Sequence, residues 1–435
     1  MRLLRSLFHE RRVLGGTAIL ALTQVAASVA GLLRDRLLNQ TFPREVTDAY
    51  FAAFRPSDFL FQACILSALG TVFVPVLASR RAHGSQGGMD RLLSAVLHVA
   101  AVVFGVIAGA LALLLPFLAP TLVQFEGEQL SLYVTFARLA LLSNLLFVFG
   151  TTFGQYLITT QRFWIYGLTP ILYTAGTIAG TIVLTPSLGP LGPMAGTLAG
   201  AAVYALLRWW DVLRAGGRLV ANVWWDAEFR SMGILMLPRA LALGAIQLQL
   251  LVFDAVGSGL GSGVVTVNAA ARNFQSVVVG AIGIALAQAV YAPLSEASAR
   301  GEMGRYRRYL SLSLLWIALL TIPAGVILVL LSPVAASLVG LHSSLAIFTP
   351  MLALYALSIP LESANHVLLR AFYARRATLI PAIAAAANGI VAIAVSVLGV
   401  ASIGILALPA AFIAGHATQA ALLGWAVRRK GSGNG

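Results

Sequence analysis

The hydrophobic residues of this chain gather in long runs separated by short polar segments, unlike the narrow apolar stripe of a soluble amphipathic helix. A run of about 18 or more apolar residues is long enough to cross the roughly 30 Å hydrocarbon core of a bilayer. Backbone groups in lipid must hydrogen-bond within their own segment, so runs of this kind form helices. The pattern predicts about twelve transmembrane helices, at 13–33, 53–78, 92–119, 132–158, 164–184, 191–213, 232–256, 264–294, 309–332, 345–371, 378–399 and 401–427.

The composition agrees with an all-α, polytopic membrane protein. Of the 435 residues, 59% are hydrophobic and only 10% are charged, and the mean hydropathy is +0.88. A soluble domain carries about 25% charged residues, so most of this chain has no surface facing water. The basic segment from Met1 to Arg12 runs into the first apolar run without a clear small-residue cleavage site. We therefore expect a retained first helix rather than a signal peptide.

The basic residues alternate between the segments that connect the predicted helices. The chain has 29 Lys and Arg residues and a net charge of +14, and most of this charge falls in every second connection. Basic loops stay on the cytoplasmic side of a membrane, so the alternation predicts that both termini lie in the cytoplasm. The positive charge is thereby explained by topology, and we expect no nucleic-acid partner.

The two halves of the chain resemble each other. The second predicted helix ends in the sequence Phe73–Ala78 before a basic loop, and the eighth ends in Tyr291–Ser295 before another. Pro293 stands 218 residues after Pro75, about half the chain. Parallel repeats of this kind are a transporter architecture. The sequence predicts a six-helix lobe at 1–213, a basic interfacial connection at 214–231, and a second six-helix lobe at 232–430, arranged around a central cavity.

Signs of enzymatic chemistry are absent from the sequence. The six histidines are scattered without metal-ligand spacing, and the single cysteine, Cys64, excludes an internal disulfide and any multi-cysteine metal site. There is no hydrolase triad and no phosphate-binding glycine loop. We therefore expect a protein that is not an enzyme and that needs no metal and no cofactor.

Ionisable residues inside or beside the apolar runs are the main candidates for function, because charges in the membrane are costly. Arg55 and Arg272 are favoured, since their helices are expected to face the cavity. A guanidinium group binds phosphate oxygens through two hydrogen bonds, so this set indicates an anionic ligand. The alternative is that these side chains form ion pairs or reach the membrane interface. The candidates for substrate binding are Arg34, Arg55, Arg138, Arg239 and Arg272, and those for ion pairs are Asp35, Asp48 and Asp254.

One predicted helix carries a row of polar residues. Glu362, His366 and Arg370 follow one another at intervals of four, which places them on one helix face. A carboxylate, an imidazole and a guanidinium in line are able to relay or sense a proton. A self-neutralised polar stripe facing the cavity is equally consistent with the spacing, and both interpretations stay open.

Three segments near the start of the chain resemble the MurJ/MviN family of lipid II flippases: Gly31–Asp35, Thr47–Arg55 and Phe73–Leu77. This family belongs to a wider superfamily of multidrug, oligosaccharidyl-lipid and polysaccharide exporters. The resemblance implies two six-helix lobes around an arginine-lined, V-shaped cavity that opens alternately to either side. It also implies an undecaprenyl-pyrophosphate-linked saccharide as substrate. The family usually has fourteen helices, and we expect the last pair to be absent here. Charged cavity or gate positions of the family match Arg34, Asp48, Arg55 and Arg272.

The sequence thus predicts a flippase that moves a polyprenyl-pyrophosphate-linked saccharide, with lipid II as one candidate, from the cytoplasmic to the external leaflet. The expected location is the bacterial inner membrane, and the expected partners are the lipid bilayer, the substrate and envelope-synthesis proteins. Membrane potential or protons would supply the energy. Two alternatives remain, namely a cation-coupled exporter of small molecules and a membrane scaffold that does not transport.

Overall fold

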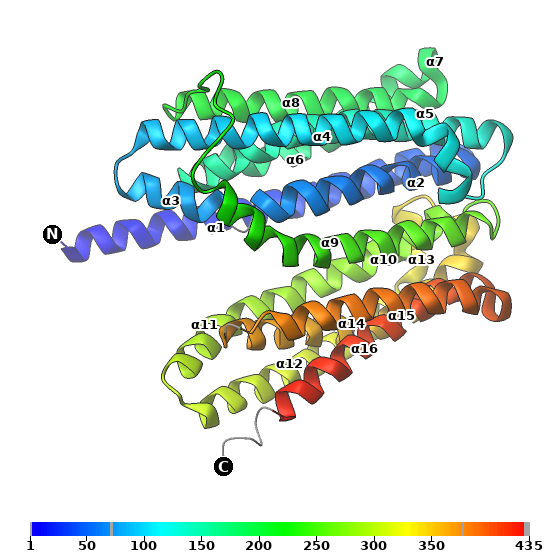
Figure 1. Cartoon of the computed structure of the whole chain (residues 1–435). Coiled ribbons are helices and arrows are strands. Elements are labelled where there is room, and N and C mark those ends of the chain that lie inside the picture. Colours follow the sequence, from blue (N-terminus) through cyan, green and yellow to red (C-terminus); the bar gives the residue numbers. More distant parts are fainter. Residues whose placement is uncertain (1, 70–72, 376, 430–435) are drawn as a thin grey trace. The chain divides into compact units, whose positions relative to one another are not determined.

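The computed structural model describes residues 2–69, 73–375 and 377–429. For residues 2–18, 21, 230–235 and 238 it describes the backbone alone. Within these residues the chain is helical and contains no strand (Figure 1). The predicted all-α class is confirmed. The helices form two compact units. The first extends to Gly244 without Thr121–Phe125, and the second contains Thr121–Phe125 and the chain from Ala245 onward.

The first unit contains eight α-helices and the beginning of a ninth among its described residues. They are α1 (Arg2–Thr41), α2 (Arg44–Leu60), α3 (Val74–Ala82), α4 (Gln86–Leu122), α5 (Gly127–Thr159), α6 (Phe163–Ala179), α7 (Thr185–Leu188), α8 (Gly192–Arg214) and α9 (Phe229–Ser258), which continues into the second unit. Helix α8 packs against α5 and α6, α2 packs against α5, and α1 packs against α6.

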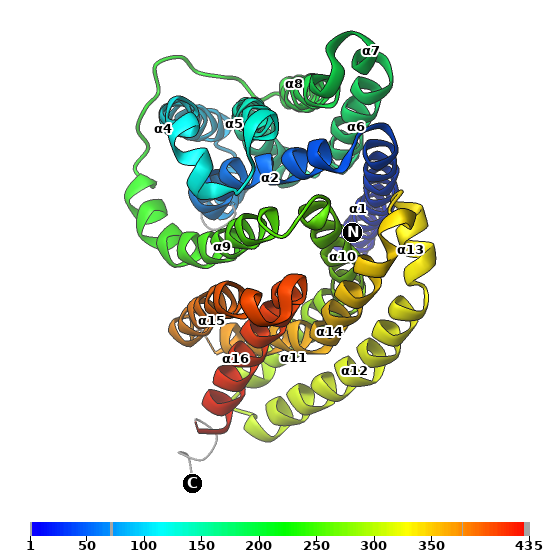
Figure 2. The same cartoon turned by 90° about the vertical axis from the view of Figure 1, so that its right-hand side faces the viewer.

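The second unit is organised around one helix, α14, which packs against α10, α11, α12 and α16 (Figure 2). Helix α15 completes the unit by packing along α16. The bounds are α10 (Val264–Val278), α11 (Ala285–Ala299), α12 (Met303–Leu330), α13 (Ser332–Leu338), α14 (Leu345–Ala374), α15 (Leu379–Ile403) and α16 (Ala407–Arg429).

Eight segments of the described chain are long and apolar enough to cross a membrane, which makes this a multi-pass membrane protein. Two of them, Phe163–Arg214 and Leu379–Arg429, each contain two helices that the sequence predicts as separate spans. The predicted spans 13–33 and 53–78 lie in α1 and in α2 through α3, outside these eight segments. Part of the second of them, residues 70–72, lies outside the described residues.

Two of the long helices change to π-helical geometry at related positions. One π-helical turn covers Phe61–Leu66, directly after α2, and another covers Val279–Ile284, directly after α10. Their first residues are 218 apart, the same separation as Pro75 and Pro293. Such turns are rare and frequently lie at functional sites. An irregular backbone therefore recurs at the same place in both halves of the chain.

Glycine residues bring α6 and α8 into close contact. A Cβ atom added to Gly196 would lie 2.6 Å from the Cα atom of Gly180, so there is no space for a side chain. Thr177 and Thr197 share a hydrogen bond of 2.7 Å in the same contact. Small residues and interhelical hydrogen bonds are the usual means by which membrane helices associate, because lipid tails are as apolar as leucine.

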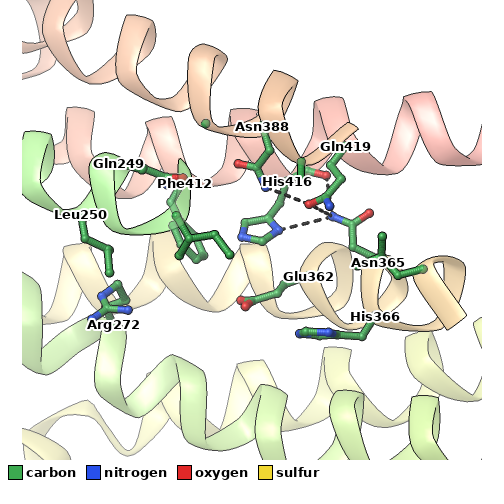
Figure 3. Close-up of a pocket in the computed structure, with 14 residues that line it drawn as sticks. Gln249, Leu250, Arg272, Glu362, Asn365, His366, Asn388, Phe412, His416 and Gln419 are labelled. Carbon is green, nitrogen blue, oxygen red and sulfur yellow. Dashed lines mark hydrogen bonds between the residues drawn. The ribbon is translucent and has the colours of Figure 1, made fainter. Parts of the chain in front are cut away.

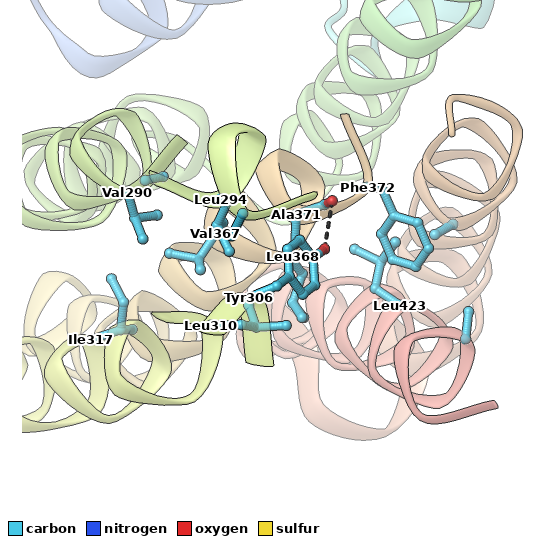
Figure 4. Close-up of a cluster of buried hydrophobic side chains, with 14 residues drawn as sticks. Val290, Leu294, Tyr306, Leu310, Ile317, Val367, Leu368, Ala371, Phe372 and Leu423 are labelled. Carbon is cyan, nitrogen blue, oxygen red and sulfur yellow. Dashed lines mark hydrogen bonds between the residues drawn. The ribbon is translucent and has the colours of Figure 1, made fainter. Parts of the chain in front are cut away.

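The interior of the second unit contains a cluster of buried hydrophobic side chains between α11, α12, α14, α15 and α16 (Figure 4). Leu294, Val367 and Leu423 are among its fully buried members. Tyr306 is also buried there, and its hydroxyl donates a hydrogen bond of 2.7 Å to the carbonyl of Ala371. The cluster joins five helices. The hydrogen bond satisfies the hydroxyl of Tyr306, the polar atom of its side chain, inside this apolar surrounding.

The segment between α8 and α9 is attached to the first unit. Arg80 donates two hydrogen bonds to Asp226, of 2.7 and 2.9 Å, and the side chain of Ser94 accepts one of 2.8 Å from the amide of Val220. Burial of Asp226 raises its pKa, but the hydrogen bonds and charge of Arg80 outweigh this and hold the pKa below its ordinary value. His98 stacks against Trp224 with 5.1 Å between the rings. The connection is therefore part of the first unit.

The contact between α6 and α8 leads to a prediction on stability. Substitution of Gly196 by alanine should push the two helices apart and destabilise the protein by about 1–3 kcal/mol, the usual cost of overpacking. The melting temperature of the full-length protein in detergent should fall accordingly. The control is Gly109→Ala, because a Cβ atom at Gly109 in α4 meets nothing within 4 Å. Equal melting temperatures for the two variants would refute the proposed packing constraint.

Candidate functional site

The second unit contains a cavity of about 160 Å³ between five helices (Figure 3). Its walls come from α9, α10, α14, α15 and α16, and its apolar surface includes Leu250 and Phe412. Many of its other side chains are polar, which is unusual for the interior of a helical membrane unit. These polar residues are Gln249, Arg272, Glu362, Asn365, His366, Asn388, His416 and Gln419.

One wall of the cavity is held together by amide hydrogen bonds. The side chain of Gln419 accepts hydrogen bonds from Asn388, at 2.8 Å, and from Asn365, at 3.4 Å. The Asn365 amide also donates to the carbonyl of His416 at 3.0 Å, and it lies 3.3 Å from Nδ1 of that imidazole. Figure 3 shows this network joining α14, α15 and α16.

On another side of the cavity, Glu362 is oriented by a side chain of α10. The Gln275 amide donates hydrogen bonds to Glu362, at 2.7 Å, and to the hydroxyl of Ser358, at 3.1 Å. Because an amide donor favours the oxygen atoms of a carboxylate, Gln275 fixes the position of Glu362 in the cavity wall. Arg272 lies one turn earlier on α10 and lines the same cavity.

Several polar atoms of the cavity wall are buried and make no hydrogen bond within the described protein. They are the Nε2 atom of Gln249 and the Oδ1 atoms of Asn365 and Asn388. A buried polar atom without a partner is costly. The cavity is large enough for several water molecules, which would satisfy these atoms. Its chemistry is therefore that of a small hydrated site with both donors and acceptors.

The structure brings three of the sequence-predicted site residues together. Arg272, Glu362 and His366 all line this cavity. Arg370, the third member of the predicted row, instead lies over the ring of Tyr291, with its guanidinium carbon 5.5 Å from the ring centre. The row from Glu362 to Arg370 is thus divided between two environments. Its predicted role in proton relay stays a prediction.

The predicted residues of α1 and α2 lie in the first unit. Arg34 donates two hydrogen bonds to Asp35, of 2.7 and 2.9 Å, and the carboxylate is buried. Asp48 is buried on α2. Arg55 is half-buried one turn before Asp58, with which it interacts electrostatically. Arg34 and Asp35 therefore form a local ion pair, and the carboxylate of Asp58 accepts a hydrogen bond of 3.1 Å from Asn144.

The remaining predicted residues lie on α5 and α9. Arg138 is exposed and donates a hydrogen bond of 2.9 Å to the carbonyl of Ala112 on α4. Arg239 is exposed on α9, and Asp254 is buried on the same helix.

Sequence reasoning missed a buried arginine in the first unit. Arg208 is only 2% exposed, and its guanidinium donates to the hydroxyl of Thr169 at 2.8 Å and to the carbonyl of Tyr166 at 2.9 Å. It also lies over the ring of Tyr204, at 4.0 Å from the ring centre. The sequence signal that could have identified Arg208 is Tyr204, one turn earlier on the same helix. An aromatic ring beside an arginine stabilises a buried guanidinium.

The two units repeat one polar contact. In the first, Asn144 on α5 donates to Ser57 on α2, 87 residues away. In the second, Gln275 on α10 donates to Glu362 on α14, also 87 residues away. Ser57 and Gln275 stand 218 residues apart, like the two π-helical turns. Equivalent positions of both units therefore carry a polar contact between equivalent helices.

No group of three or more His, Cys, Asp or Glu side chains in the described part of the chain is placed to hold a metal ion.

The sequence model of one protein family, described as lipid II flippase MurJ, matches residues 42–434. The chain belongs to the MurJ lipid II flippase family.

Individual MurJ relatives are distant in sequence. The chain is 25% identical to the lipid II flippase MurJ of Burkholderia cenocepacia over 312 residues, which is 69% of this chain and 60% of the relative. It is 24% identical to the probable lipid II flippase MurJ of Bdellovibrio bacteriovorus over 397 residues, 87% of this chain and 75% of that relative. The match therefore spans less than two thirds of the Burkholderia relative's length.

Solved structures show the same fold. A lipid II flippase MurJ in an inward closed conformation aligns over 94% of this chain and 87% of its own, with a TM-score of 0.77 and 19% identity. An inward-facing multidrug resistance MATE family transporter of the MOP superfamily aligns over 94% and 96%, with a TM-score of 0.79 and 14% identity. The polytopic helical fold predicted for the MurJ/MviN family is confirmed.

The amide network of the cavity leads to a second stability prediction. Substitution of Gln419 by leucine removes the acceptor of Asn388 and leaves a buried amide donor unpaired, which costs about 1–3 kcal/mol. The melting temperature of the full-length protein in detergent should fall. The control is Thr418→Val on the same helix, since the Thr418 hydroxyl donates to the carbonyl of Ala414 within α16. A loss no larger than that of the control would show that the network does not stabilise the unit.

Proposed function

We propose that this chain is a flippase that moves a polyprenyl-pyrophosphate-linked saccharide, with lipid II as the leading candidate, from the cytoplasmic to the external leaflet. The family match over residues 42–434 carries this proposal. The likeness of the fold to both MurJ and MATE transporters supports alternating access. A charged saccharide head group cannot cross hydrocarbon unaided, because transfer of an unpaired charge there costs many kcal/mol.

In this proposal the diphosphate contacts Arg55 and Arg272. Arg272 lines a polar cavity, and Arg55 is half-buried within an apolar helix. Arg34 and Arg138 contribute less to substrate binding, because Asp35 and a backbone carbonyl already engage them. Arg239 is exposed and can contribute only long-range attraction. The buried carboxylates Asp35, Asp48 and Asp254 are proposed to form the ion pairs that hold a closed state.

We further propose that the protein lies in the bacterial inner membrane with both termini in the cytoplasm, where envelope-synthesis proteins would be its partners. The alternation of basic connections supports this orientation. Fusion of a fluorescent protein after residue 429 tests it, since the fusion should fluoresce only if that end is cytoplasmic. Fluorescence lost from an intact fusion would contradict it.

A proton is the proposed coupling ion, carried by Glu362 and His366. Both line the same cavity, one helical turn apart, and His416 lies across it on α16 (Figure 3). An imidazole changes charge near neutral pH, so a proton gradient is able to change the charge of this cavity. Arg370, which lies over Tyr291, is proposed to stabilise the helix rather than to carry the proton.

A second candidate is a cation-coupled exporter of small molecules, favoured by the TM-score of 0.79 with the MATE transporter. At 14% identity this likeness concerns the fold alone. Binding assays on the purified protein separate the two, because the flippase should bind a polyprenyl diphosphate and the exporter a cationic drug. A scaffold that does not transport would fail to replace a flippase in a depleted host.

The contacts with the diphosphate predict loss of function at two positions. Arg55→Ala and Arg272→Ala should each abolish growth when they replace the flippase of a depleted bacterial host, and Arg→Lys at either position should restore growth in part. Membrane abundance and melting temperature should stay near those of the parent. Arg300→Ala is the control, since Arg300 is exposed and pairs with Glu296 at 2.9 Å. Normal growth of both alanine variants would exclude diphosphate anchoring by these arginines.

The coupling proposal predicts a change in gradient dependence. In vesicles containing the purified protein and a fluorescent polyprenyl diphosphate, a pH gradient should accelerate translocation several-fold. Glu362→Gln should remove this acceleration, because the amide cannot take up a proton, and should keep the slower basal rate. Glu296→Gln, a change of the same type at an exposed glutamate, should leave the acceleration intact. Acceleration that survives in Glu362→Gln would show that another group carries the proton.

A further inference from the structure

The first unit carries a separate pocket of about 700 Å³ where α5, α6 and α8 approach one another at their ends. It is lined by the turn from Thr160 to Arg162, by the start of α6 and by the end of α8. Every lining residue belongs to the first unit. The pocket is therefore distinct from the cavity of the second unit.

The lining of this pocket is positively charged. It contains three arginines, Arg81, Arg162 and Arg214, and a single carboxylate, Asp211. Asp211 is buried and pairs with Arg162, whose Nε atom donates to it at 2.9 Å. One carboxylate cannot neutralise three guanidinium groups, so the pocket favours an anion.

Existing contacts orient the three guanidinium groups and leave donors available. Arg81 donates to the backbone carbonyl of Thr159. Arg214 lies over the ring of Trp210, with its guanidinium carbon 4.3 Å from the ring centre. Each guanidinium has five N–H donors, so these contacts use only part of the donor set. Arginines held in place in this way bind a phosphate at little cost in side-chain entropy.

Two tryptophans give the pocket an amphipathic character. Trp164 is 61% exposed and Trp210 is 46% exposed, and both line the pocket beside the arginines. Exposed tryptophans of membrane proteins lie at the level of the lipid head groups. Ile19 and Phe163 add apolar surface. An anion with an apolar body fits this combination better than a small soluble ion does.

The backbone adds to the attraction for an anion. Gln161 has a φ angle of 61°, and this left-handed conformation turns the chain sharply between α5 and α6. The amide of Arg162 bonds back to the carbonyl of Leu157 at 2.8 Å. Helix α6 then begins at Phe163 without a side-chain cap, so its first amide groups add partial positive charge beside Arg162.

We propose that this pocket binds the phosphate group of an anionic glycerophospholipid of the adjacent leaflet, with Arg81, Arg162 and Arg214 as donors and the two tryptophans beside the lipid backbone. The diphosphate of a transported lipid has related chemistry. The arginines proposed to contact that diphosphate, Arg55 and Arg272, lie outside this pocket, however, and the exposed Trp164 and Trp210 beside it match the level of the lipid head groups. A resident membrane lipid therefore fits it better.

The test measures lipid binding to the full-length protein in detergent by mass spectrometry of the intact complexes, with dioleoylphosphatidylglycerol and dioleoylphosphatidylcholine as probes. The parent should prefer phosphatidylglycerol. Arg81→Gln and Arg214→Gln should each weaken its binding about fivefold, and together about twenty-five-fold, as expected for loss of one and two cations near a lipid phosphate. Binding of phosphatidylcholine should hardly change. Arg162 is kept, because its loss would leave Asp211 buried without its partner.

Two further variants make the result decisive. Arg218→Gln removes an exposed arginine from the connection outside the pocket and should leave phosphatidylglycerol binding unchanged. If the double variant does not fold, Arg81→Glu alone should weaken binding more than about tenfold, because it replaces attraction by repulsion. Unchanged affinity in a folded double variant overturns the proposal. So does one-for-one displacement of phosphatidylglycerol by a polyprenyl diphosphate, which would assign the pocket to the transported substrate.

Discussion

Hydrogen bonding in hydrocarbon is the constraint on which this structure depends. A helix satisfies its own amide and carbonyl groups, which is why each long apolar run becomes a helix and why helices account for nearly all of the described chain. Irregular backbone needs support from neighbouring elements. The π-helical turns Phe61–Leu66 and Val279–Ile284 each precede a helix that contains proline, Pro75 in α3 and Pro293 in α11. These two departures from regular helix are short and lie at equivalent positions of the two halves.

The same constraint governs the polar side chains. Arg208 is tolerated in the interior because its donors reach a hydroxyl and backbone carbonyls and its face lies against two tyrosine rings. The cavity of the second unit differs, because Gln249, Asn365 and Asn388 each retain a buried atom without a protein partner. A unit selected only for stability would fill such a space with apolar side chains. These groups instead lie next to Glu362 and His366, where water in the cavity would satisfy them.

Sequence patterns predict the helices of this protein better than they predict its site. Span positions follow from apolar runs, so the predicted 92–119 and 132–158 lie within α4 and α5. The four-residue spacing of Glu362 and His366 correctly placed both on one face, since that contact is local. The spacing does not show that Arg370 also lies over the ring of Tyr291, because that residue belongs to another helix. His416, Asn388 and Gln419 were missed for the same reason. His416 and Gln419 lie on α16 and Asn388 lies on α15, and only tertiary packing unites them with Asn365 on α14.

The polar contact that recurs between equivalent helices carries different chemistry in the two units. In the first unit Ser57 also donates to the backbone carbonyl of Ala140, 83 residues away, and in the second Gln275 donates to the side chain of Ser358, again 83 residues away. The geometry is thus conserved between units while the chemistry differs. The position of Asn144 is occupied by Glu362 in the second unit, where a neutral amide is replaced by a group that can ionise. The contact holds this position in place in both units. In the second unit it fixes the Glu362 carboxylate in a polar cavity, whereas in the first unit the equivalent amide of Asn144 donates to Ser57 and to Asp58.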